Sequence, residues 1–163
     1  MSTIPATAEQ LAWLAAAREQ AAIAENSGDV PVGAVVVDAQ GAIIARGFNT
    51  RQVTGDVAGH AEINALNEAG RVRGERVLSD CTLVVTLEPC AMCAGAILAS
   101  RVGRVIFGAW DDKAGAAGSV YDLLRDGRLP HPVPEVIGGI DAATCATQLT
   151  AFFSAKRQYG ETA

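Results

Sequence analysis

Two cysteines three residues apart, Cys90 and Cys93, follow an apolar run and stand at the predicted start of a helix. Positions three apart share one face of a helix, so both sulfurs can bind the same metal ion. Further upstream, the triplet His60-Ala61-Glu62 opens another predicted helix and offers an imidazole and a carboxylate. To use this pattern, the fold must bring the starts of two helices together. No other feature of the sequence constrains the architecture as strongly.

Three side chains stand at ligand spacing, namely His60, Cys90 and Cys93. Structural zinc sites are closed by four protein ligands, whereas catalytic sites keep three and leave the fourth position to water. The count therefore predicts one catalytic Zn²⁺, with Glu62 as the acid/base beside the water. There are two alternatives. One is a redox Cys-x-x-Cys pair of the thioredoxin type, and the other is a Glu62 that only complements the helix dipole.

Length and composition limit the class of protein. The chain has 163 residues, of which 50% are hydrophobic, and we expect a single domain over residues 1–163. A net charge of −5 does not indicate a globally basic nucleic-acid binder. We find no signal-peptide pattern and no apolar run long enough for a membrane span, and therefore expect a cytoplasmic protein. Four cysteines are too few for a disulfide scaffold.

Helical and strand patterns alternate along the chain. A capping box, Thr7-x-x-Gln10, precedes the first helix. The predicted helices cover residues 11–25, 60–69, 90–100, 120–125 and 141–159, and the predicted strands cover 33–38, 42–48, 82–87, 102–107 and 133–137, with a polar loop at 49–59. This order indicates an α/β domain with helices on both faces of a sheet.

Segments along nearly the whole chain resemble the cytidine deaminase-like superfamily and, within it, the bacterial tRNA-specific adenosine deaminases. They are VPVGAVVV at 30–37, GFN at 47–49, GHAEINAL at 59–66, TLEPCAMCAGAI at 86–97, SRVGRVIFGAWDDKAGAAGSVYDLL at 100–124 and FFSAKR at 152–157. The His-x-Glu and Pro-Cys-x-x-Cys motifs are the established signature of the superfamily, and the segment after them is more particular. The resemblance implies a three-layer α/β/α fold with a central five-stranded mixed sheet, and a homodimer with one Zn²⁺ per subunit.

The resemblance also implies a reaction, the hydrolytic deamination of adenosine to inosine at the wobble position of a tRNA anticodon. Glu62 would move the protons. Asn49 would contact the target nucleoside, and Ala61 with the Leu87–Glu88 backbone would line the base pocket. The residues implied to face the anticodon loop are Asp111, Lys113, Phe152 and Arg157.

Two departures from the family pattern leave the substrate open. This chain has Asp56-Val57-Ala58-Gly59 where the family usually has Asp-Pro-Thr-Ala, and Pro130 where an Asn commonly precedes the late histidine. A deaminase of a free nucleobase or nucleoside, of the guanine, cytosine or triazine type, therefore remains an alternative that uses the same zinc site. A zinc-stabilised RNA-binding module without catalysis is a further alternative, which requires a fourth protein ligand.

Oligomerisation has one physical indication in the sequence. The predicted helix at residues 90–100 is apolar or small around almost its whole circumference. Such a helix must be covered on every side, either by a partner subunit or by a larger core.

Overall fold

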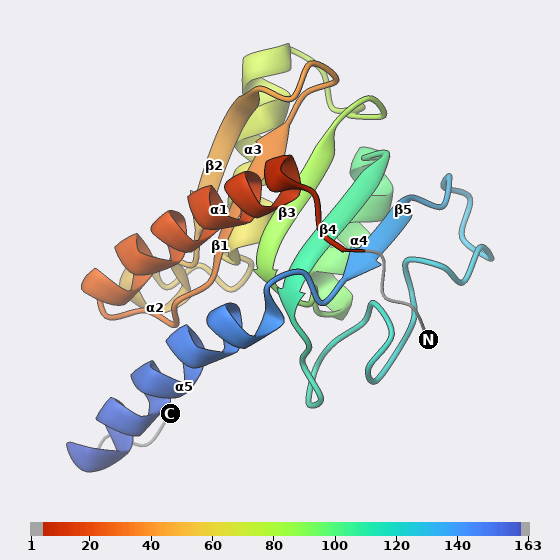
Figure 1. The fold of residues 1–163 in the computed structure, drawn as a ribbon. Helices are drawn as coiled ribbons and strands as arrows, with labels where there is room; N and C mark the ends of the chain where they lie inside the picture. The colour runs from red at the N-terminus through yellow and green to blue at the C-terminus, as the bar shows by residue number, and fades with distance from the viewer. Residues whose placement is uncertain (1–4, 161–163) are drawn as a thin grey trace.

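A five-stranded mixed sheet forms the centre of the computed structural model, which describes residues 5–160 (Figure 1). The strands lie in the order β2-β1-β3-β4-β5. They are β1 (Gly33–Val37), β2 (Ile43–Phe48), β3 (Thr82–Leu87), β4 (Arg104–Ala109) and β5 (Glu135–Gly138). Strand β1 is antiparallel to β2 and β3, whereas β3, β4 and β5 are parallel. The predicted five-stranded mixed sheet is confirmed.

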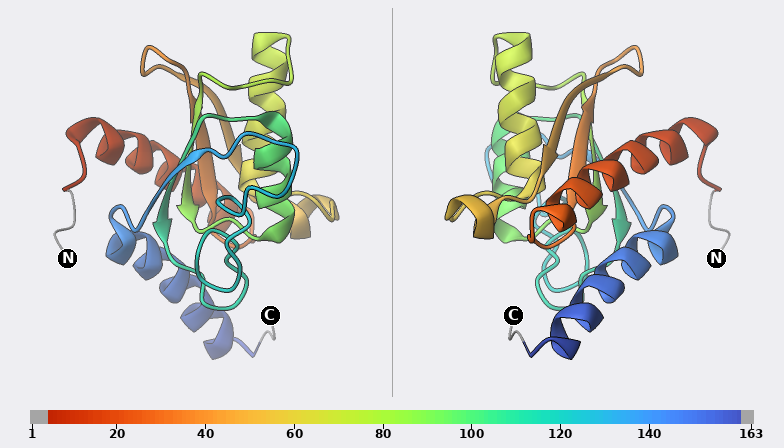
Figure 2. Two further views of the ribbon diagram at one scale, coloured as in Figure 1. Left: turned by 90° about the vertical axis from the view of Figure 1, so that its right-hand side faces the viewer. Right: turned by 90° about the vertical axis from the view of Figure 1, so that its left-hand side faces the viewer.

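Helices cover both faces of the sheet (Figure 2). They are α1 (Ala8–Asn26), α2 (Arg51–Thr54), α3 (Ala61–Arg73), α4 (Ala91–Ser100) and α5 (Ala142–Gln158). Helices α1 and α5 pack on one face, and α3 and α4 on the other. All five residues of β1 are buried, as expected for a strand with helices on both sides. No helix within residues 5–160 is long and apolar enough to cross a membrane.

The layers bring the starts of α3 and α4 to one edge of the sheet. Strands β2, β3 and β4 run in the same direction, so their carboxyl ends meet at that edge. Helix α4 begins four residues after the end of β3, with Cys90 as its N-cap. Helix α3 begins with His60 as its N-cap. The carboxyl edge of a sheet is where α/β proteins commonly bind ligands.

The predicted capping box of α1 is confirmed, because Thr7 Oγ1 accepts from Gln10 N at 3.1 Å and Gln10 Oε1 accepts from Thr7 N at 3.0 Å. Most other boundaries differ from the prediction by a few residues. Helix α3 continues past Gly70 to Arg73, because the glycine with positive φ that ends it is Gly74 (φ 69°). Similarly, α4 begins at Ala91, so Pro89 precedes the N-cap and is not the first helical residue.

Two local predictions were wrong. Residues 120–125 form turns, not a helix, because their amides donate back to the preceding loop: Tyr121 N donates to Gly115 O, and Leu123 N donates to Ala116 O. The predicted loop at 49–59 contains the short helix α2. The N-cap residue of α2, Thr50, makes no side-chain capping bond, and the first amides of the helix are satisfied by Asn49 and Asp29 instead.

Candidate metal centre and its pocket

Three ligand atoms converge where α3 and α4 begin. His60 Nδ1 lies 3.5 Å from Cys90 Sγ and 3.4 Å from Cys93 Sγ, and the three ligand atoms all lie within 4.8 Å of one another. Bond lengths typical of zinc, about 2.3 Å to sulfur and about 2.0 Å to nitrogen, separate N and S by about 3.5 Å in a tetrahedral site. The spacing of these side chains therefore matches a zinc ion held by one imidazole and two sulfurs.

Hydrogen bonds within the cluster and burial set the pKa values of the three ligands. His60 and Cys90 are N-caps with extended backbone, and Cys93 lies in the first turn of α4. The pKa of Cys90 falls to about 3, because the Cys93 thiol donates to its sulfur and His60 hydrogen-bonds to it. The hydrogen bond with Cys90 raises the pKa of His60, and the pKa of Cys93 is raised by its bond to the same sulfur and by burial. Zinc takes both cysteines as thiolates.

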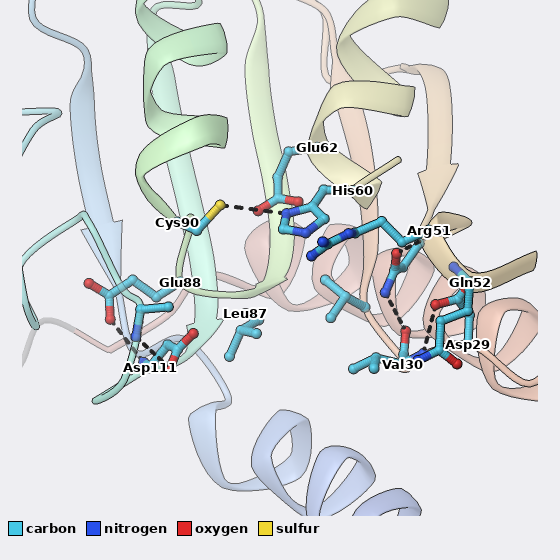
Figure 3. Close-up of a pocket in the computed structure, with 13 residues that line it drawn as sticks. Asp29, Val30, Arg51, Gln52, His60, Glu62, Leu87, Glu88, Cys90 and Asp111 are labelled. Atoms are coloured by element: carbon cyan, nitrogen blue, oxygen red, sulfur yellow. Dashed lines mark hydrogen bonds between the residues drawn. The ribbon is translucent and has the colours of Figure 1, made fainter. Parts of the chain in front are cut away.

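Glu62 lies in the first turn of α3, two residues after His60, and it is 3% exposed. On a regular helix these positions point to different sides, but His60 has extended backbone angles (φ −77°, ψ 152°). The Glu62 carboxylate therefore lies beside the imidazole (Figure 3). Burial penalises its charged form and raises its pKa to about 7. A buried carboxyl with that pKa, unlike a simple first-turn acid, can both take and give a proton near neutral pH.

A pocket of about 490 Å³ opens in front of this cluster (Figure 3). Its volume is in the range of pockets that hold small ligands. The metal cluster contributes two of its ligands and Glu62 to the lining of the pocket. The remaining lining comes from the end of β3, the start of α2 and the loops at the carboxyl edge of the sheet. The lining residues outside the cluster are Asp29, Val30, Val32, Asn49, Arg51, Gln52, Leu87, Glu88, Asp111 and Ala114.

Four of the predicted substrate residues line this pocket: Asn49, Leu87, Glu88 and Asp111. The other four do not. Ala61 is fully buried behind the wall, Lys113 and Arg157 are exposed elsewhere, and Phe152 is 7% exposed with Lys156 Nζ 5.0 Å above its ring. The roles of all eight remain predictions.

The Glu88 side chain fixes the loop that forms one wall of the pocket. Its carboxylate accepts from Asp111 N at 2.9 Å, Ala117 N at 3.0 Å and Ser119 N at 2.9 Å, and also from the Ser119 hydroxyl. Burial alone would raise the pKa of Glu88, but these hydrogen bonds outweigh it and hold the pKa below its ordinary value. A Cβ at Gly115 would lie 2.3 Å from the Glu88 carboxylate, so only glycine fits there.

On the opposite side of the pocket are residues that the sequence analysis missed, above all Arg51 and Asp29. Asp29 is fully buried, and its Oδ2 accepts from Gln52 N at 2.9 Å and Val53 N at 3.2 Å. It therefore caps α2 from outside the helix. The sequence signal was one acidic residue in a loop 23 positions away, which no local pattern connects to α2.

The family model for the cytidine and deoxycytidylate deaminase zinc-binding region matches residues 7–109, which include all three metal ligands. A tRNA-specific adenosine deaminase of Bacillus subtilis (strain 168) is 42% identical over 146 residues, covering 90% of this chain and 89% of the relative. The chain belongs to the tRNA-specific adenosine deaminase family. The predicted zinc centre at His60, Cys90 and Cys93 is confirmed, and this deaminase is a zinc-dependent hydrolase.

A longer relative and a solved structure are also similar to this chain. A tRNA(Ile)-lysidine synthase of Deinococcus radiodurans is 48% identical over 147 residues, which are 88% of the deaminase chain. The deaminase chain spans only 25% of that longer relative. A solved structure from a study of A-to-I editing by tRNA:A34 deaminases at the wobble position of transfer RNA has a TM-score of 0.81 and 36% identity. The match covers 85% of this chain and 99% of that chain.

Proposed function

We propose that this deaminase converts adenosine to inosine at the wobble position of a tRNA anticodon. One observation carries the proposal. A three-ligand zinc centre and a buried, unligated carboxylate stand at a nucleoside-sized pocket, in a chain that aligns over 90% of its length with a tRNA-specific adenosine deaminase. Three protein ligands also argue against a purely structural zinc, because no fourth His, Cys, Asp or Glu joins the cluster within residues 5–160.

Zinc bound at this centre supplies a Lewis acid that lowers the pKa of water. In the proposed reaction Glu62 takes a proton from the attacking water and gives it to the N1 atom of adenine. It then passes a second proton from the same water to the leaving amine at C6, and ammonia departs. The pKa of about 7 suits Glu62 to both transfers. Its burial, at 3% exposure, shields these steps from bulk solvent.

In this proposal the base enters between two walls. Leu87 offers an apolar surface to the purine, while Asn49 and Asp111 contact the nucleoside. Residues outside the pocket wall, Lys113, Phe152 and Arg157, contact the anticodon loop beyond the flipped base. An extruded base needs such outer contacts, because unstacking it costs a few kcal/mol.

Sequencing an anticodon stem-loop after incubation with the zinc-loaded deaminase tests the proposal. We expect adenosine to be read as inosine at the wobble position, with no release of ammonia from guanine, cytosine or a triazine. Release of ammonia from one of those free bases, with no change in the RNA, would contradict the proposal and favour the free-base alternative.

We further propose that the deaminase is a homodimer that pairs through α4. One face of α4 packs on the sheet through Cys93, Ala94, Ile97 and Leu98. The opposite face is exposed and carries only apolar or small residues, which are Ala91, Met92, Gly95 and Ala99. Contiguous exposed apolar faces are typical of subunit interfaces.

Gly95 allows a specific test of this interface. A Cβ added at Gly95 meets no atom within 4 Å, so a longer side chain fits on the isolated subunit. We expect Gly95→Glu to convert the dimer into a folded monomer in sedimentation velocity, because the new charge is buried only when two copies pair. A wild-type protein that sediments as a monomer, or a Gly95→Glu variant that stays dimeric, would exclude α4 as the interface.

A further inference from the structure

Arg51 stands at the mouth of the pocket, on the side opposite Glu88. Its side chain extends from the start of α2 toward the His60 ring (Figure 3). Among the described residues that line the pocket, it is the one lysine or arginine. No carboxylate within residues 5–160 forms an ion pair with it. The guanidinium therefore has no anionic partner among residues 5–160, although four carboxyl residues line the same pocket.

Those four carboxylates are committed elsewhere or belong to catalysis. Asp29 holds α2, and Glu88 holds the loop at residues 111–119. Asp111 Oδ1 accepts from the amides of Lys113 and Ala114. Glu62 is buried beside the metal centre. The positive charge of Arg51 is therefore left for a ligand.

The backbone under Arg51 is held rigidly. The first three amides of α2 have no partner inside so short a helix, and each finds one in a side chain. Asn49 Oδ1 accepts from Arg51 N at 3.2 Å, and Asp29 Oδ2 accepts from Gln52 N and Val53 N. Asn49 is itself fixed by the bond from its Nδ2 to Val30 O at 3.3 Å. Two buried polar side chains thus fix the backbone from which the Arg51 side chain extends.

We propose that Arg51 binds a phosphate group next to the flipped nucleoside, so that the pocket selects a nucleotide within RNA over a free base. The inference rests on the proposed function. Phosphate is the only anionic part of a nucleotide, and a guanidinium binds it through two parallel hydrogen bonds. Asp29 is then a positioning residue, which acts through the placement of Arg51.

The experiment measures kcat/KM on two anticodon stem-loops as a function of salt. One has native phosphates, and the other carries neutral methylphosphonates on both sides of the wobble adenosine. Arg51→Gln should lower kcat/KM on the native RNA about tenfold to a hundredfold. It should reduce the slope of log kcat/KM against log salt by about 0.7, the value for one contact to single-stranded RNA. On the methylphosphonate RNA, the variant and the wild type should be equal.

Further variants separate a phosphate contact from other causes. Arg76→Gln removes the same charge from an exposed residue beyond the far end of α3, and should change neither quantity. Arg51→Lys should fall between wild type and Arg51→Gln, because it keeps the charge and loses the paired hydrogen bonds. Asp29→Asn leaves an amide N–H facing a backbone N–H. It should reduce the salt slope in the same way, and add no further reduction in the Arg51→Gln background.

The outcomes distinguish this inference from the proposed function. A wild-type protein that does not deaminate the native stem-loop removes the proposed function and this inference with it. Suppose the wild type deaminates the native stem-loop, but Arg51→Gln has an unchanged kcat/KM or loses the same factor on both RNAs. This result overturns the phosphate contact and leaves the proposed function in place. A fall in kcat/KM of Arg51→Gln on the native RNA only, together with a smaller salt slope, supports the phosphate contact.

Discussion

Replacing Glu88 by alanine should be one of the most destabilising single changes in this deaminase. The substitution removes the acceptor of four hydrogen bonds, from Asp111 N, Ala117 N, Ser119 N and the Ser119 hydroxyl. A hydrogen bond contributes a net of about 1 kcal/mol, and more when the acceptor is charged. The expected loss in the free energy of unfolding is therefore about 4 kcal/mol. For a chain of this length, that corresponds to a fall in Tm of about 8–16 °C.

Urea unfolding of the zinc-loaded protein, followed by tryptophan fluorescence, measures this loss. Trp110 is a suitable reporter because its ring packs against Gly118 in the same loop. Ser119→Ala should cost about 1 kcal/mol in the wild-type background and much less beside Glu88→Ala, since its partner is then absent. The control is Glu135→Ala, which breaks an exposed ion pair with Arg104 and should cost under about 1 kcal/mol.

Two results would refute the reasoning. A loss below about 1 kcal/mol for Glu88→Ala would show that water satisfies the freed amides, so that the carboxylate does not hold the loop. Full additivity of the Glu88 and Ser119 substitutions would show that the two side chains are not coupled.

The remaining predictions concern catalysis and pH. Glu62→Gln should keep a full complement of zinc, measured by metal analysis, and lose about 10²–10⁴-fold in deamination rate, measured by ammonia release. The control Glu68→Gln, on the exposed side of α3, should change neither the zinc content nor the rate. Near-normal turnover by Glu62→Gln would remove Glu62 from proton transfer. Burial raises the pKa of Cys81 and of Cys145 to about 11. Because the folded-state pKa lies above the unfolded value of about 8.5, the stability from these thiols is fully present below that pH and is lost as the pH rises toward 11. The unfolding free energy should therefore fall between pH 9 and 11, and fall less in Cys145→Ala; an identical pH profile for that variant would contradict the assignment.

The metal ligands and the layered sheet were predictable because their determinants are local. Cys90 and Cys93 are neighbours on one helix start, and continuous apolar runs such as β1 allow only a strand covered on both faces. The position of Glu62 relative to His60 was harder to predict. It depends on His60 being an extended N-cap and not the first helical residue, and sequence patterns place helix ends only to within a residue or two.

The elements that were predicted wrongly depend on contacts between distant residues. Asp29 satisfies two of the first amides of α2, and the amides of the turns at residues 120–125 find carbonyls in the preceding loop. Neither Asp29 nor Arg51 has a sequence motif of its own. Both became candidates only when the fold placed them at the pocket.

Packing explains Gly59, the last position of the departure at residues 56–59. The segment Val57 to Gly59 lies outside the pocket wall, and Val57 is 77% exposed. A Cβ at Gly59 would lie 2.8 Å from Thr50 Oγ1, and this hydroxyl is held in place by Asn64 Nδ2 at 3.2 Å. An alanine at position 59, usual in the family, would therefore collide with Thr50. The glycine compensates for the threonine, and the backbone bond from Thr50 N to Gly59 O, at 2.8 Å, keeps the loop closed beside His60. Neither Thr50 nor Gly59 lines the pocket, so this departure gives no reason to prefer a free base over a nucleotide in RNA.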